Sequence, residues 1–75
     1  MTYMFEVTVI RRFVGNGIQL PVGLSVHVPF ELPYGVVSLP AGKKRIIEAF
    51  RMQCGIDLSG CPAAISSAYM KEVRD

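Results

Sequence analysis

Histidine and cysteine are scarce in this sequence, which has one histidine, His27, and two cysteines, Cys54 and Cys61, among 75 residues. A four-ligand zinc site within one chain lacks ligands. The C-x-x-C spacing of a redox pair is absent, because the cysteines are seven positions apart. We therefore expect no metal, no cofactor and no structural disulfide, and we interpret both cysteines as thiols in a reducing compartment.

Long apolar runs are also missing. The longest uncharged segment, residues 13–30, has about the length of a membrane span, but glycines, prolines and polar residues interrupt it. Met1 leads directly into a strand pattern that contains Glu6, without the basic and apolar regions of a secretory signal. There are no internal repeats, linkers or low-complexity tracts. The sequence predicts a cytoplasmic protein with no membrane partner.

Apolar residues, by contrast, are abundant. They make up 51% of the chain even without glycine, whereas an average protein reaches about 45–50% with glycine included. A chain of 75 residues forms a single domain, residues 1–75, with one modest core. Some apolar side chains must therefore lie on the surface, where a second copy or another protein partner commonly covers them.

Two-residue alternation dominates the first 30 residues and predicts strands. Strands are expected over residues 2–14, 18–20 and 24–30, with a short edge strand at 35–38. The strand over 2–14 is long, which indicates that it bends or serves two pairings. The Gly15-Asn16-Gly17 turn predicts a hairpin between the first two. The side chains expected on the buried face are Tyr3, Phe5, Val7, Val9 and Phe13, then Leu24, Val26, Val28 and Phe30.

The pattern changes to helical spacing at residues 43–54, where Ile46, Phe50 and Cys54 recur on one side. Gly55 follows and suits the left-handed conformation that ends a helix. Residues 63–73 fit both helix and strand periods, and we favour a final strand over 67–74 beside the first. The prediction is an α+β fold of order β-β-β-α-β, with one amphipathic helix across a small bent antiparallel sheet of three to five strands, open or barrel-like.

The order of these landmarks resembles a family of short uncharacterised bacterial proteins. That family has an opening F-x-V-T-V strand, a V-x-G-x-x-L-x-x-G-x-S-V centre, an A-F helix ending in Y-G-I-D-L, and a closing S-x-Y strand. This sequence departs from the pattern at Cys54, where an aromatic residue is usual, and in its proline-rich middle. The resemblance implies a fold and no activity. The matching segments are Phe5-Glu6-Val7-Thr8-Val9, residues 16–26, Ala49-Phe50, Cys54-Gly55-Ile56-Asp57-Leu58 and Ser67-Ala68-Tyr69.

Motifs for catalysis are weak. Residues 35–44 end in Ala-Gly-Lys-Lys, but the glycine spacing and the missing Ser or Thr do not fit a phosphate loop. Ser25 and His27 share a strand face, yet nothing in the sequence orients the histidine as a base. The acidic residues are scattered, so no carboxylate pair is indicated. We therefore expect a protein that is not an enzyme.

Basic residues form two clusters, Arg11-Arg12 and Lys43-Lys44-Arg45, which hold five of the eight cations. Cations near a helix N-terminus are unfavourable unless an anion binds there. The alternative function is therefore weak, sequence-nonspecific nucleic-acid binding through these five residues. The net charge of only +2 and the absence of a recognisable nucleic-acid motif favour the simpler interpretation as solvated charges.

The outer face of the strand over 2–14 gives the main functional hypothesis. Met4, Ile10 and Val14 are apolar residues on that face, which one helix cannot also cover. We expect a non-catalytic interaction or assembly module that self-associates, as a dimer, through this face or through an exposed sheet edge.

Overall fold

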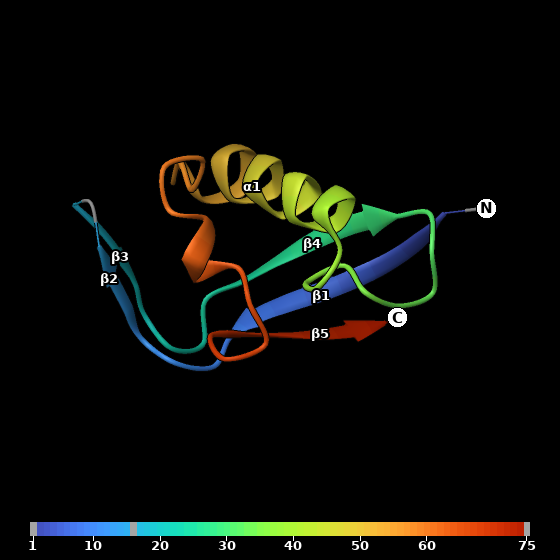
Figure 1. Ribbon diagram of the computed structural model, residues 1–75, viewed down its shortest axis with the longest axis horizontal. Helices are drawn as coiled ribbons and strands as arrows, with labels where there is room; N and C mark the ends of the chain where they lie inside the picture. The colour runs from blue at the N-terminus through green and yellow to red at the C-terminus, as the bar shows by residue number, and fades with distance from the viewer. Residues whose placement is uncertain (1, 16, 75) are drawn as a thin grey trace.

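Strand β1 (Tyr3–Val9) is the central strand of a three-stranded antiparallel sheet, with β4 (Ser25–Phe30) on one side and β5 (Met70–Arg74) on the other (Figure 1). The computed structural model describes residues 2–15 and 17–74. Within them, β2 (Phe13–Gly15) and β3 (Ile18–Leu20) form a separate two-stranded sheet. The predicted α+β class is confirmed, in the order β-β-β-β-α-β.

The core lies between the three-stranded sheet and helix α1 (Pro40–Cys54), which packs against β4 on one face of the sheet (Figure 1). Alternation along β1 and β4 directs one set of side chains toward the helix, as predicted. Phe5 and Phe30 meet edge to face, with ring centroids 6.4 Å apart, and Phe50 from α1 is fully buried with them. The sheet face beneath α1 therefore forms one side of the core.

The strand predicted over residues 2–14 is interrupted at residues 10–12. The backbone N–H of Ile10 donates to the carbonyl of Tyr69 (2.8 Å), and the ring of Phe13 packs at right angles to that of Tyr69. The chain then leaves the first sheet and pairs Phe13 with Leu20 in the hairpin. One continuous strand was thus a wrong prediction, whereas its two separate pairings were expected. The two sheets do not close into a barrel. Asn16, part of the predicted hairpin turn, lies outside the described residues.

The short strand predicted at residues 35–38 is also wrong, since this segment is a turn that leads into the helix. Gly35 has φ of +85°, and its carbonyl accepts hydrogen bonds from the N–H groups of Ser38 and Leu39. The helix begins at Pro40, three residues before the predicted start. Proline favours the first helical position because its φ is fixed and its missing N–H is not needed there.

The end of α1 and the last strand follow the prediction more closely. Gly55 adopts φ of +70° and ψ of +18°, and the N–H groups of Gly55 and Ile56 bond to carbonyls of the last turn. Turns and a short 3-10 helix, η1 (Pro62–Ala64), then lead to β5. The strand interpretation of the tail is confirmed, but β5 begins at Met70 rather than at residue 67, because residues 66–69 turn back through hydrogen bonds to the Ser66 carbonyl.

Candidate functional site

One face of the three-stranded sheet is not covered by any helix or strand in residues 2–15 and 17–74. Strand register places eight side chains on it, and all of them are exposed or half-buried. Met4 and Val73 are 43% and 45% exposed, and Ile10, just beyond the end of β1, is 47% exposed. Isolated exposed apolar residues are ordinary, whereas several close together make a sheet face a candidate contact surface. We call this surface the uncovered face: Met4, Glu6, Thr8, Ser25, His27, Pro29, Lys71 and Val73.

The centre of the uncovered face is polar. His27 of β4 lies opposite Glu6 of β1, with Nε2 and Oε2 4.0 Å apart, and Val73 of β5 lies on the other side of Glu6. Both side chains are well exposed, and exposed ion pairs contribute only about 0–1 kcal/mol. Ser25 shares this face, as predicted, but its register partner is Thr8. The arrangement offers electrostatic complementarity on an open surface.

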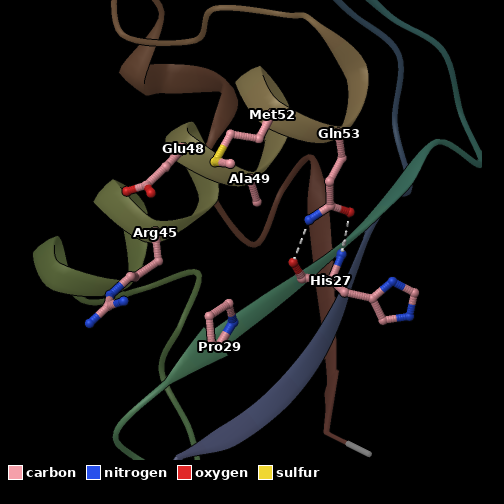
Figure 2. Close-up of a pocket in the computed structure, with 7 residues that line it drawn as sticks. All are labelled: His27, Pro29, Arg45, Glu48, Ala49, Met52 and Gln53. Atoms are coloured by element: carbon pink, nitrogen blue, oxygen red, sulfur yellow. Dashed lines mark hydrogen bonds between the residues drawn. The ribbon is translucent and has the colours of Figure 1, made fainter.

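The edge of the sheet at β4 is closed by α1. The side chain of Gln53 donates from Nε2 to the carbonyl of His27 (2.8 Å) and accepts from its N–H at Oε1 (3.1 Å), as Figure 2 shows. Pro29 has no N–H to offer a further strand. An exposed strand edge invites pairing with another chain, and proline and covering groups oppose it. This edge is therefore protected against strand addition.

The opposite edge, at β5, has no strand beside it among the described residues (Figure 1). The carboxylate of Glu72 accepts hydrogen bonds from the N–H groups of Gly35 (3.0 Å) and Val37 (3.1 Å), which ties the turn before α1 to β5. The guanidinium of Arg74 lies 5.4 Å from the ring centroid of Tyr3. These contacts hold both side chains on the helix side of the sheet and leave the backbone edge of β5 open.

A groove of about 340 Å³ lies between α1 and the edge of β4 (Figure 2). Ala49, Met52 and Pro29 provide apolar contact, while Arg45 and Glu48 flank it on the helix. Arg45 is also paired with the carboxylate of Glu31. No cluster of three or more metal-ligating side chains occurs within the described residues. The lining of the groove therefore combines apolar side chains with the charged groups of Arg45 and Glu48.

The two basic clusters belong to different segments of the chain. Arg11 and Arg12 are exposed in the bend between β1 and β2, whereas Lys43, Lys44 and Arg45 lie in the second turn of α1 (Figure 1). Arg11 stacks over the ring of Tyr69, with 5.7 Å from its guanidinium carbon to the centroid. The five cations are thus divided between two segments, with two neighbouring residues in one and three in the other.

The three residues predicted for self-association are divided as well. Met4 and Ile10 belong to the side of β1 that carries the uncovered face, whereas Val14, 60% exposed, lies on the separate hairpin. Val73 was missed, although two-residue alternation within the predicted final strand is a signal that could have found it. No local signal in the sequence identifies Gln53 or Glu72. Gln53 bonds to His27, 26 residues away, and Glu72 bonds to Val37 and Gly35, which are 35 and 37 residues away.

Asp57 shows the clearest electrostatic effect, in the turn after α1. Hydrogen bonds from the side chain and backbone of Ser59 hold the pKa of the Asp57 carboxyl below its ordinary value. Asp57 is exposed and lies in a turn outside both sheets, so its lowered pKa concerns the turn and not the sheet surface.

Cys54 is half-buried and Cys61 is buried, and both are thiols.

The described residues form a small α+β domain in which one sheet face is uncovered, the β4 edge is closed by Gln53, and no strand lies beside β5. The chain belongs to a family of unknown function (DUF6140), which matches residues 1–72. This confirms the resemblance to an uncharacterised family. No curated protein and no solved structure matches the chain. Within the described residues, none of the helices has the length and apolar character needed to cross a membrane.

Proposed function

We propose that this protein is a non-catalytic interaction module that self-associates as a dimer through its three-stranded sheet. The observation that carries the proposal is the asymmetry of that sheet: α1 covers one face and closes the β4 edge, while the other face and the β5 edge are left accessible. Proteins commonly cover such edges and faces, either within the chain or with a partner.

A second copy suits this surface because the surface carries both signs of charge beside apolar side chains. Glu6 lies between His27 and Val73 across the strands, and Lys71 lies opposite Thr8. A two-fold dimer uses the same patch on both subunits, so the patch must be complementary to itself. A patch with an acid, a base and apolar residues meets that condition. The cytoplasmic location expected from the sequence is part of this proposal.

Two lysine substitutions test the proposal. We expect Val73→Lys and Ile10→Lys to shift the protein toward the monomer, because each places a charge on an apolar contact. Val22→Lys is the control, since Val22 is 64% exposed, lies in the turn before β4 and is not one of the eight residues of the uncovered face. Light scattering after size-exclusion chromatography gives the masses. A wild-type protein that is strictly monomeric, and unaffected by Ile10→Lys, contradicts the proposal.

A further inference from the structure

We infer that the second copy docks edge to edge, with β5 of one subunit antiparallel to β5 of the other and Val73 facing its own counterpart. This inference deepens the proposed function and rests on it. The first argument is elimination of the other edge: Gln53 occupies both backbone groups of His27 on β4, and Pro29 has no N–H. Strand addition is therefore directed to β5.

The second argument is the direction of the backbone groups of β5. The N–H of Ile10 donates to the carbonyl of Tyr69, and hydrogen-bonded pairs alternate along an antiparallel ladder. In the register that pairs Val9 with Met70, residues 71 and 73 therefore point their backbone groups toward β1. The N–H and C=O groups of Glu72 and Arg74 point away from β1, toward the open edge. These two residues are the ones that a further strand would bond.

The third argument is charge, which selects the register. The strand contains Lys71, Glu72, Val73 and Arg74 in sequence. Centring the two-fold axis on Val73 places Glu72 of each copy opposite Arg74 of the other, so that two pairs of opposite charges form. Centring it on Glu72 or on Lys71 places like charges directly opposite each other, which is destabilising. The Val73-centred register also makes Glu72 and Arg74 a hydrogen-bonded pair, as their backbone directions require.

The side chains of Glu72 and Arg74 are already held on the same face of the sheet. Two N–H groups, of Gly35 and Val37, bond to the Glu72 carboxylate, which has acceptor sites for about four. Arg74 directs one guanidinium nitrogen to the carbonyl of Pro33 at 3.5 Å and keeps its other donors for a partner. Little side-chain ordering is therefore required on docking.

The resulting assembly is one continuous six-stranded sheet, β4-β1-β5 followed by the same order reversed. A two-fold axis perpendicular to the sheet keeps both α1 helices on one side and joins the two uncovered faces on the other. Val73 of both copies then lies at the centre of the combined face. The strand contact itself is short, with about four backbone hydrogen bonds, so the dimer is expected to be reversible.

Covalent trapping tests the geometry directly. Facing residues of a non-hydrogen-bonded pair bring their Cα atoms to about 4.5 Å, within the range that a disulfide spans. Val73→Cys is therefore expected to give a covalent dimer under mild oxidation. Val22→Cys is the control: it also retains Cys54 and Cys61, but its new cysteine lies outside the β5 contact. We expect it to form no more covalent dimer than the wild-type protein does.

Charge exchange tests the register. Arg74→Glu leaves the bonds from Glu72 to Gly35 and Val37 in place, yet it sets acid against acid across the axis, so we expect the dimer Kd to rise at least about fivefold. Glu72→Arg sets base against base. A mixture of these two variants restores both opposite-charge pairs and is expected to form the heterodimer, measured by light scattering, with circular dichroism to confirm folding of each.

The outcomes separate this inference from the proposed function. A covalent Val73→Cys dimer together with recovery in the mixed variants supports edge pairing. A wild-type dimer that Arg74→Glu leaves unchanged, with no cross-link through Val73→Cys, overturns edge pairing and leaves self-association through another surface. A wild-type monomer at every concentration overturns both.

Discussion

The side-chain amide of Gln53 bonds to the backbone of His27 through both its nitrogen and its oxygen, as a neighbouring strand would. The helix thus supplies one residue that completes the outer edge of β4. In a three-stranded sheet, this contact makes the two edges different. The edge that remains accessible is that of β5, and we place the partner there.

Replacing Gln53 should therefore affect both stability and assembly. Gln53→Ala removes two hydrogen bonds that contribute about 0.5–1.5 kcal/mol each, and 1 kcal/mol corresponds to about 4–8 °C in the melting temperature of a domain this small. We expect a lower melting temperature and species larger than a dimer, because a second edge becomes available. Met52→Ala is the control, since Met52 is 74% exposed on the neighbouring helix position. Species no larger than wild type would show that the amide does not protect the edge.

The buried ring of Phe50 should be essential to folding. Phe50 is fully buried between α1 and the sheet, and truncation of a buried aromatic costs about 3–5 kcal/mol, which is comparable with the whole stability of a small domain. Phe50→Ala is expected to unfold the protein or to lower its melting temperature severely in circular dichroism. Glu48→Ala, on the exposed side of the same helix, should change little. Equal effects from both variants would mean that the helix packs differently.

Gly42 illustrates a requirement that sequence patterns did not reveal. A Cβ atom at this position would lie 2.1 Å from the carbonyl oxygen of Val36, so backbone must shift to admit any side chain. Gly42→Ala, which would normally stabilise a helix by about 1 kcal/mol, is expected to destabilise this one by about 1–3 kcal/mol. Gly60→Ala is the control, because a Cβ there meets no atom within 4 Å. Urea unfolding measures both, and a stabilised Gly42→Ala would contradict the close approach.

Nucleic-acid binding, the alternative function, now has a sharper expectation. Each phosphate contact contributes about −0.9 to the slope of log affinity against log salt for duplex DNA, so three contacts give about −3 and five give roughly −4 to −5. Because the basic clusters belong to different segments, with three cations in the larger one, we expect any binding at low salt to show a slope no steeper than about −3. Lys43, Lys44 and Arg45 changed together to alanine should then abolish the slope if α1 is the site. A slope near −5 would mean that both clusters bind one molecule.

Much of the fold was predictable because its signals are local. Two-residue alternation identified β1 and β4, helical spacing identified most of α1, and Gly55 marked its end. The length of the predicted strand indicated a bend, and Arg11 falls on the buried side of the alternation. The position of the break after Val9 was not predictable, since it involves contacts with Tyr69, which is distant in sequence. The segment 35–38 looked like a strand because its valines are apolar, but they are buried in a turn beneath the helix.

The candidate surface was predictable only in part. Met4 and Ile10 were identified by alternation along one strand, which needs no knowledge of neighbours. Which edge is open depends on Gln53 meeting His27 and on Glu72 meeting the turn at Gly35, and these contacts join residues far apart in sequence. The ambiguous tail became a strand because β1 offers it a partner edge, which no property of the tail alone determines.

Self-association of the wild-type protein is the central claim, and sedimentation equilibrium over a range of micromolar concentrations tests it most directly. The account predicts a mass that rises with concentration from that of one chain toward twice that value, as a reversible dimer requires. A mass equal to one chain at every concentration would contradict it.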